Sequence, residues 1–310
     1  MTISTATTMF VGKKVVDYDP KQTPNLSKDV VYRLALEYED TTSMAELIEQ
    51  FLSKVDKSQV EALIIGAWPE PHDTGVDDIL ATLIAHTAEL PNFRALFVGD
   101  MTYEECEISW IVQGNYTALL NALPQLEVLR IRGSSGLKIE AFSHANLRSL
   151  IIECGGLPAA VPEALVKSHL PSLEHLELWL GDQNYGFEGD LALYQRVVLH
   201  LLNPKLRYLG LRNAEIADQL AQWLSSQEWL AQLETLDLSL GNIGDRGAQA
   251  LLDCAALVKL SCLNLSHHYI SDEMQAKLAA LPIMVLLDDA QEADDDEDED
   301  GGGRYVAVGE

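Results

Sequence analysis

The 310-residue sequence has no long hydrophobic run and few basic residues. No stretch approaches the roughly 20 consecutive apolar residues that a helix needs to cross a membrane, so a membrane-spanning helix is excluded. Lys and Arg number 21 against 48 Asp and Glu, which gives a net charge of −27. Because nucleic-acid backbones are bound by clustered cations, this balance argues against a DNA- or RNA-binding protein.

Paired cysteines and catalytic motifs are absent as well. No cysteine belongs to a Cys-x-x-Cys, so neither a zinc site nor a disulfide framework is indicated. The four are Cys106, Cys154, Cys254 and Cys262. There is no Gly-rich phosphate loop, no G-x-S-x-G and no H-E-x-x-H. The sequence therefore predicts a protein that is not an enzyme and that uses no metal and no cofactor.

Two histidine positions are the nearest approach to a metal or acid–base site. His72 precedes Asp73, and His267 precedes His268. Neighbouring residues of a strand point to opposite faces, so we do not expect His267 and His268 to share one metal. The first residues, MTISTATTMFVGKK, lack a basic region followed by an apolar run and a cleavage site. We therefore expect a cytoplasmic protein.

What the sequence does contain is a repeated apolar pattern. L-x-x-L-x-L, with other apolar residues allowed, recurs nine times between Val31 and Leu265. The last three copies are spaced by 27 residues, and three further columns keep that period. These columns are Ile216, Ile243 and Ile270; Asp218, Asp245 and Asp272; and Leu224, Leu251 and Leu278. The fourth positions of the nine copies are Leu34, Leu63, Leu96, Leu129, Leu150, Leu176, Leu209, Leu236 and Leu263.

Each copy predicts a strand followed by a helix. The fourth and sixth positions of an extended segment point the same way, into a core, while the fifth points out. A single copy cannot bury its own apolar face, so neighbouring copies must stack. The sequence predicts an α/β leucine-rich-repeat solenoid of about nine repeats, with a parallel sheet on the concave face and helices on the convex face. The expected parts are an N-terminal cap (1–30), the solenoid (31–287), a disordered acidic linker (288–303) and a C-terminal peptide (304–310).

One copy carries a family resemblance. The stretch Leu233–Leu252, LETLDLSLGNIGDRGAQALL, resembles the repeat of the ribonuclease-inhibitor-type leucine-rich repeats, in which a strand is followed by N-x-L-x-D-x-G-A and a helix. The residues in those slots are Asn242, Ile243, Asp245, Gly247, Ala248 and Leu251. The resemblance covers roughly residues 30–287 and is nearest in character to short cytosolic bacterial leucine-rich-repeat proteins. Such folds host inhibitors, GTPase activators, receptors and scaffolds.

The outward positions of the central strands predict a partner-binding surface on the concave face. Arg, Trp and Tyr are the residue types that dominate interface hot spots. The candidates are Arg130, Arg132, Glu153, Glu177, Trp179, Tyr208 and Arg212. One interpretation is that Arg130 and Arg132 pair with Glu153 and Glu177 across the strands. The other is that they bind an acidic partner, and the chain's own acidic tail is then a candidate occupant.

Three insertions follow strand ends and predict a second contact surface. They span residues 66–79, 99–115 and 181–190, and all leave the same edge of the expected sheet. Their aromatic residues are Trp68, Tyr103, Trp110, Tyr185 and Phe187. Loops held by a rigid scaffold often carry binding residues, so these aromatics are interpreted as rim contacts. The alternative is that they pack inward and close the loops themselves.

The end of the chain combines an acidic run with a short apolar peptide. Ten acidic residues lie between Asp288 and Asp300, and such a run is typical of disorder. The following peptide alternates in a β-favouring manner, and its candidate contact residues are Arg304, Tyr305, Val306 and Val308. Three interpretations stay open: a solubilising tail, a docking peptide that adds a strand to an exposed sheet edge, or a substrate held out for a modifying enzyme. The edge could belong to a partner or to this chain.

Together these features predict a non-enzymatic module that binds a protein or peptide through the concave face and the loop rim. Two alternatives accompany it. One is a regulator of a partner enzyme, in the manner of a GTPase activator. The other is a carrier whose C-terminal peptide is modified.

Overall fold

The structure, a computed structural model, divides the chain into two compact units, each of which is described by itself. The N-terminal unit comprises Thr2–Glu153 and Glu163–Leu173, and the C-terminal unit comprises Cys154–Pro162 and Glu174–Gly309. The residues described are 3–26, 29–294 and 303–309. No helix among these residues is long and apolar enough to cross a membrane.

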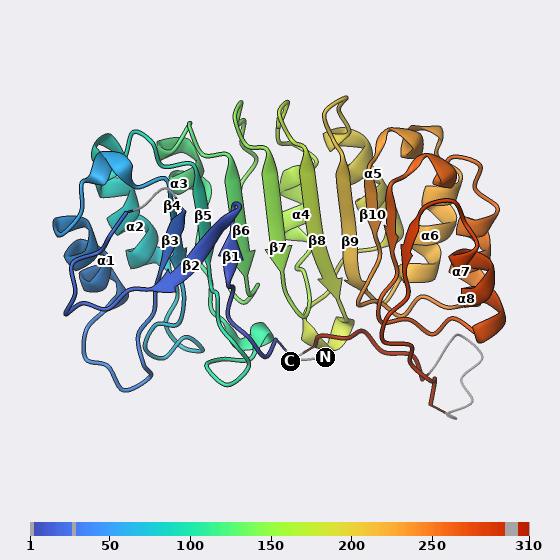
Figure 1. Cartoon of the computed structure of the whole chain (residues 1–310), viewed down its shortest axis with the longest axis horizontal. Helices are drawn as coiled ribbons and strands as arrows, with labels where there is room; N and C mark the ends of the chain where they lie inside the picture. The colour runs from blue at the N-terminus through green and yellow to red at the C-terminus, as the bar shows by residue number, and fades with distance from the viewer. Residues whose placement is uncertain (1–2, 27–28, 295–302, 310) are drawn as a thin grey trace. The chain divides into compact units, whose positions relative to one another are not determined.

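The N-terminal unit is built on a sheet with helices on one face (Figure 1). A short antiparallel pair, β1 with β2, leads into strands that are all parallel. The strands are β1 (Met9–Phe10), β2 (Lys13–Asp17), β3 (Val30–Leu34), β4 (Ala62–Ile65), β5 (Ala95–Val98), β6 (Val128–Arg132) and β7 (Ser149–Glu153). The helices are α1 (Met44–Ser53), α2 (Asp77–Ala85) and α3 (Thr117–Ala122), with 3-10 turns at Lys57–Gln59, Thr87–Glu89 and Ile108–Trp110.

The C-terminal unit repeats the same strand–helix alternation with a wholly parallel sheet. Its strands are β8 (His175–Gly181), β9 (Tyr208–Ala214), β10 (Thr235–Asp237), β11 (Cys262–Asn264) and β12 (Met284–Leu286). Its helices are α5 (Leu191–Leu201), α6 (Ala217–Ser225), α7 (Asp245–Leu252) and α8 (Asp272–Ala279), and α4 (Ala160–Leu165) spans the boundary between the units. The 3-10 turns are Gln183–Tyr185, Glu228–Gln232 and Leu257–Lys259.

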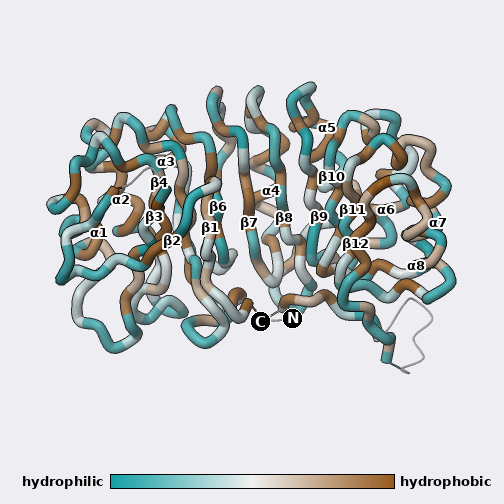
Figure 2. The backbone as a smooth tube through the Cα atoms, in the orientation of Figure 1, coloured by the Kyte–Doolittle hydropathy of each residue, from teal (hydrophilic) through white to brown (hydrophobic). Residues whose placement is uncertain are grey.

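The inward leucines account for this architecture. The fourth-position residues Leu96, Leu150 and Leu236 are 0% exposed. Each of the nine predicted segments contains a strand, and hydrophobic residues recur along the strands in Figure 2. Burying each aliphatic side chain contributes about 1.5–3 kcal/mol, so the stacked columns are the main source of stability. The fold is an α/β leucine-rich-repeat fold.

The register of the first repeat differs from the sequence-based expectation by two residues. Tyr32 pairs with Leu63, and Leu34 pairs with Ile65, whereas the apolar pattern aligns Leu34 with Leu63. The inward slot is held by Tyr32, whose ring lies 5.5 Å from that of Phe51. A search for aliphatic residues at the inward position misses this one, because it is occupied by tyrosine. The outward position therefore belongs to Arg33.

The aspartate column links neighbouring repeats. Asp218 Oδ1 accepts hydrogen bonds from the N–H groups of Gly244 (2.9 Å) and Gly247 (3.0 Å), which belong to the next repeat. Asp245 likewise accepts from the N–H and hydroxyl of Ser271. Each carboxylate thus caps the entry to the following helix rather than its own, because orphan N–H groups at a helix start need acceptors.

The β1–β2 pair covers part of the outward face of the N-terminal sheet. Phe10 packs in a buried apolar cluster with Val31, Ile64 and Phe97, and its ring lies 6.1 Å from that of Phe97. Figure 1 shows this pair crossing in front of the neighbouring strands. The predicted cap therefore encloses side chains that an uncovered sheet would expose.

The segment expected to be a disordered linker lies partly outside the described residues, because 295–302 belong to the undescribed part. Its described residues are held by backbone contacts with the preceding repeat. Asp288 C=O accepts from His267 N–H at 2.8 Å, and Ala290 bridges His268. Asp288 and Ala290 therefore belong to an ordered turn after β12, whereas the sequence predicted a disordered linker from residue 288.

Candidate functional site

The N-terminal unit contains a buried arginine–carboxylate cluster on its outward sheet face. Arg132 Nε donates to Glu153 Oε2 at 2.7 Å, and Arg130 contacts Glu153 Oε1 at 2.5 Å. Arg132 also donates to the C=O of Met101 at 2.8 Å. Both guanidinium groups lie over the ring of Phe97, at 4.3 Å and 5.2 Å from its centroid. The cluster is held by β5, β6 and β7.

Asp100 anchors this cluster from the end of β5. Its carboxylate is 0% exposed and lies 3.3 Å from both Arg132 and Arg33. It also accepts from the N–H (3.1 Å) and the hydroxyl (2.9 Å) of Thr7, which ties the N-terminal segment down. Arg33 further contacts Glu105 at 2.9 Å. Sequence reasoning missed Arg33 because the first repeat was aligned two residues out of register.

The C-terminal unit carries its own polar network on the outward face. Glu177 accepts from Trp179 Nε1 at 2.8 Å and from Arg212 at 2.7 Å. Arg212 also lies 3.5 Å from Asp237, which accepts from the Tyr208 hydroxyl at 2.8 Å. His175 and Ser239 complete it: the His175 ring stacks on Tyr208 at 3.9 Å, and Ser239 accepts from Arg212 at 2.9 Å. The network joins β8, β9, β10 and the segment that follows β10.

The pKa shifts of this network show that its ion pair stays charged. Burial alone raises the pKa of Glu177, but hydrogen bonds from His175 and Trp179 and the charge of Arg212 hold it well below its usual range. Burial lowers the pKa of Arg212, yet Glu177 and Asp237 raise it overall. Burial raises the pKa of Tyr208 far above its usual range, so this hydroxyl stays protonated and donates.

These contacts bear on the two interpretations of the concave arginines. Arg130 and Arg132 pair with Glu153, as the first interpretation has it. Glu177 pairs with Arg212 of its own unit instead. Each cation already faces a carboxylate, so an acidic partner would have to displace an internal one, at a large desolvation cost.

The rim aromatics divide into packed and exposed residues. Trp68 is 2% exposed and its indole N–H donates to the C=O of Thr74, while Phe187 packs against Tyr194. These two close their loops. The exposed ones are Tyr103, Trp110 and Tyr185, at 44%, 58% and 36%. Tyr38, which follows β3, is 58% exposed and was not singled out from the sequence.

A cavity of about 200 Å³ in the N-terminal unit is bordered by Tyr38, one of the exposed aromatics of that unit. It is lined by Leu36, Glu37, Tyr38, Ala67, Trp68, Pro71, Glu104 and Glu105. The Val112 N–H donates to the C=O of Pro71 at 2.8 Å, which joins the 99–115 loop to the 66–79 loop. We call Tyr38, Tyr103, Trp110 and this cavity the aromatic rim.

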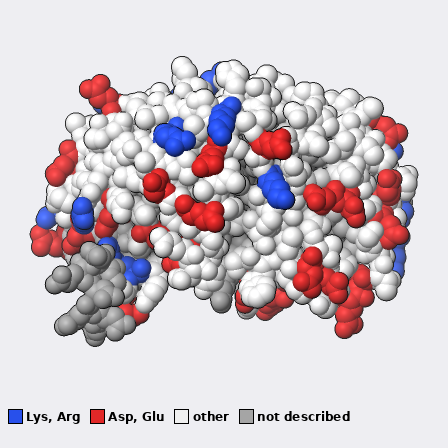
Figure 3. All heavy atoms as spheres, turned by 180° about the vertical axis from the view of Figure 1, so that it is seen from behind, with Lys and Arg blue, Asp and Glu red and all other residues white. Residues whose placement is uncertain are grey.

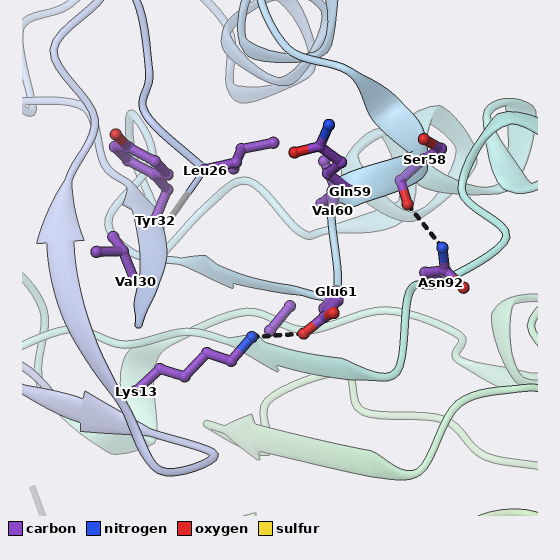
Figure 4. A pocket seen from close by; sticks show the side chains of 10 residues that line it. Lys13, Leu26, Val30, Tyr32, Ser58, Gln59, Val60, Glu61 and Asn92 are labelled. Carbon is purple, nitrogen blue, oxygen red and sulfur yellow. Dashed lines mark hydrogen bonds and ion pairs between the residues drawn. The ribbon is translucent and has the colours of Figure 1, made fainter. Parts of the chain in front are cut away.

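A second cavity of the N-terminal unit, of about 250 Å³, lies near the starts of its strands (Figure 4). Lys13 and Glu61 point toward each other there and pair at 2.5 Å, and Asn92 donates to the C=O of Ser58 at 2.8 Å. Its two charged residues neutralise one another. The lining therefore offers little to select a charged ligand.

The C-terminal peptide lies along the strand ends of its own unit (Figure 1). Val308 is 3% exposed and bonds the side chain of Asn213, while Arg304 contacts Asp218 at 3.1 Å. Tyr305 is 56% exposed and Val306 is half-buried. The peptide does not lie on the arginine network.

Comparison with solved structures identifies a related protein. A crystallised protein from Bacteroides fragilis is 32% identical, with a TM-score of 0.79, over 89% of this chain and 76% of that one. The chain belongs to the family of this Bacteroides protein. An internalin from Listeria monocytogenes is 15% identical over 85% of this chain and 68% of that one, with a TM-score of 0.40. No protein-family model and no curated protein matches the chain.

Acidic residues outnumber basic ones in this protein, 48 to 21. Figure 3 shows Asp and Glu spread over one face with few Lys and Arg. Within the described residues, no group of three or more His, Cys, Asp or Glu could hold a metal ion. His268 Nδ1 accepts from Ile270 N–H at 3.1 Å, and His267 faces Asp289 at 3.1 Å, so the two rings have different partners.

Proposed function

We propose that this chain is a protein-binding module that engages its partner through the aromatic rim of the N-terminal unit. The observation that carries the proposal is that this unit exposes three aromatic side chains, of which Tyr38 lines a cavity, and that the loop bearing the other two is joined to the cavity-lining loop through Val112 and Pro71. Tyr38 and Trp110 are each 58% exposed and Tyr103 is 44% exposed. Exposed tyrosine and tryptophan on a rigid scaffold supply large contact areas at little entropic cost, and they dominate interface energies.

The carboxylates around the aromatic rim define the chemistry of the partner. Glu37, Glu104 and Glu105 line the cavity, and only Glu105 is described with an arginine partner, Arg33. A Lys or Arg side chain placed there would face both carboxylates and aromatic rings, and each attracts a cation. We therefore propose a partner segment that carries a basic residue next to apolar residues.

The proposal is tested with a display library of short peptides selected on the full-length chain. We expect enrichment of peptides in which Lys or Arg adjoins an aromatic or aliphatic residue. Their Kd should rise at least tenfold in the Tyr38→Ala/Trp110→Ala variant, because the loss of even one hot-spot side chain removes at least about 1.4 kcal/mol of binding free energy. Binding should also weaken between low and high salt.

Leu199→Ala is the matched control, since Leu199 is 50% exposed on α5 of the other unit. It should leave peptide binding unchanged. Selection of acidic peptides, or equal binding to the wild type and the Tyr38→Ala/Trp110→Ala variant, would overturn the proposal.

A further inference from the structure

Three residues at equivalent places of successive repeats adopt the left-handed backbone conformation. They are Asn213 (φ 52°), Leu240 (φ 66°) and His267 (φ 62°). Each follows the inward leucine of its repeat by four residues, so the three are 27 residues apart. Asparagine tolerates this conformation, but a leucine there is strained. Such strain persists where the surrounding structure holds the residue, often at a binding site. We call these residues the corner residues.

Each corner residue contacts the C-terminal peptide. The buried amide of Asn213 accepts from the Val308 N–H at 3.0 Å and donates to the Val308 C=O at 2.6 Å. The Leu240 C=O accepts from the Ala307 N–H at 2.8 Å. His267 Nε2 lies 3.4 Å from the Tyr305 C=O. Successive corners thus hold successive parts of the peptide main chain.

The spacing of the corners fits an extended chain. Neighbouring strands lie about 4.8 Å apart, so three corners span about 9.6 Å. The contacted residues 305 to 308 span three steps of about 3.3 Å, or about 10 Å. An extended peptide can therefore cross the strand ends with its polar groups in step with the repeats.

Glycines let the peptide approach closely at two places. A Cβ on Gly155 would lie 2.1 Å from the Gly309 carbonyl oxygen, and a Cβ on Gly244 would lie 2.2 Å from the Arg304 guanidinium. That guanidinium contacts the carboxylate of Asp218 at 3.1 Å. The groove formed by these glycines, Asp218 and the corner residues is called the corner groove.

The peptide side chains indicate what the corner groove selects. Ala307 and Val308 are buried, at 9% and 3% exposed, whereas Tyr305 is 56% exposed. Arg304 supplies the positive charge that faces Asp218. The preference is for a basic residue, then small apolar residues three and four positions later, then glycine. Because most contacts go to the main chain, other sequences of this chemistry fit as well.

The peptide reaches the corner groove as a tethered ligand. The Asp294 N–H donates to the Gly303 C=O at 2.9 Å, so the two ends of the 295–302 connection lie together. A tether of this length keeps a ligand at a high effective concentration even when its own affinity is weak. Among its described residues, only Ala307 and Val308 have well-buried side chains, and ordering the peptide costs conformational entropy. Both facts favour an exchangeable occupant.

We propose that the corner groove is a peptide-binding site whose resident ligand is residues 303–309, and that an extended segment of a partner protein with the same chemistry replaces it. The C-terminal segment then acts as an intramolecular competitor. The apparent affinity of the wild-type chain for a partner is then the intrinsic affinity of the corner groove multiplied by the fraction of molecules in which the tail has left it.

The test measures binding of a fluorescent peptide, RYVAVGE, to full-length chains. Val308→Asp places a charge in a buried site and should release the tail. We expect this variant to bind the free peptide at least tenfold more tightly than the wild type does. Adding Asn213→Ala to the Val308→Asp chain should abolish the gain, because the amide that holds residue 308 is lost.

The controls separate this effect from unfolding and from unspecific binding. Val258→Asp places the same charge at a valine that is 43% exposed in the same unit and should behave as the wild type. Arg304→Glu, at a partly exposed side chain, is a second way to weaken the tail and should also increase peptide binding. A scrambled peptide should not bind. Circular dichroism monitors folding of every variant.

The proposal is overturned if folded Val308→Asp and Arg304→Glu chains bind RYVAVGE no better than the wild type or the scrambled peptide. The residues of the aromatic rim are unchanged in all these variants. Failure here would therefore leave the proposed function standing, and failure of the library selection would leave the corner groove standing.

Discussion

The two units place arginine–carboxylate networks on the same kind of outward strand position, but they enclose them to different degrees. In the N-terminal unit, the side chains of Arg132, Glu153 and Asp100 are 5%, 2% and 0% exposed, and Arg130, at the edge of the network, is more open at 24%. In the C-terminal unit, Arg212 is 20% exposed and Glu177 is 8% exposed. The N-terminal segment adds Thr7 to the first network. The comparison shows that covering segments, rather than the repeat itself, decide whether such a network is sealed.

The largest expected effect is that of Arg132→Ala. It removes one of the two arginines that neutralise Asp100 and one of the two that neutralise Glu153, both buried carboxylates, and leaves Arg33 and Arg130 in place. The free energy of unfolding should fall by about 3–5 kcal/mol. Urea denaturation followed by circular dichroism measures this. Arg207→Ala, in an exposed pair with Glu234, is the control and should cost under about 1 kcal/mol. Equal losses would contradict a sealed network.

Glu177→Gln tests the more open network, and its effect depends on pH. The variant loses charge-assisted hydrogen bonds and should be about 1.5–3 kcal/mol less stable at neutral pH. The pKa of Glu177 is lowered on folding, so its contribution is complete above the unfolded value of about 4.3 and is lost as pH falls below it. The difference from the wild type should therefore shrink between pH 5 and pH 2, in urea titrations at each pH.

Glu273→Gln is the control for that titration. Glu273 pairs with Lys277 on the surface of α8, and its side chain is 83% exposed. We expect no measurable difference from the wild type at any pH. A Glu177→Gln difference that grew on acidification would show that the carboxylate is not the stabilising form.

A matched pair of hydroxyl deletions compares the networks directly. Thr7→Val removes a donor to the fully buried Asp100, and we expect a loss of about 1.5–3 kcal/mol. Ser239→Ala removes an acceptor of the less buried Arg212, and a loss of about 0.5–1.5 kcal/mol is expected. We expect the thermal unfolding midpoint to fall further in Thr7→Val than in Ser239→Ala. The reverse order would mean that the N-terminal segment adds little.

The smallest effect is expected at His86, outside both networks. Hydrogen bonds with Glu89 and then Glu49 raise the pKa of His86 on folding. Its contribution is complete below the unfolded value of about 6.5 and is lost as pH rises through the folded pKa. His86→Gln should lower the thermal midpoint slightly at pH 6 and not at pH 9. An unchanged midpoint at pH 6 would show that these pairs contribute nothing.

Much of this fold can be predicted from the sequence, because every repeat must place apolar residues at the same inward positions of its strand. Leu209, Leu236 and Leu263 lie where their spacing predicts, each in a strand. The first repeat was misaligned because Tyr32 fills an inward slot while Val31 and Leu36 imitate the apolar pattern. A rule based on apolarity cannot distinguish these positions.

The contact surfaces were less accessible to prediction. Trp68 and Tyr38 are both aromatic, but only the folded structure shows that Trp68 is buried and Tyr38 exposed. The corner residues share a backbone angle and no side-chain chemistry, so no column of similar residues reveals them. The sequence shows only the general 27-residue period of these repeats, in other columns of residues.

The agreement in spacing between the corners and the C-terminal segment has an evolutionary consequence. Duplication of one repeat would add one corner and lengthen the path across the strand ends by about 4.8 Å, or roughly one and a half extended residues. A tail of unchanged length would then fall out of step with the corners. Among homologues, gains and losses of C-terminal repeats are therefore expected to coincide with insertions and deletions ahead of Arg304.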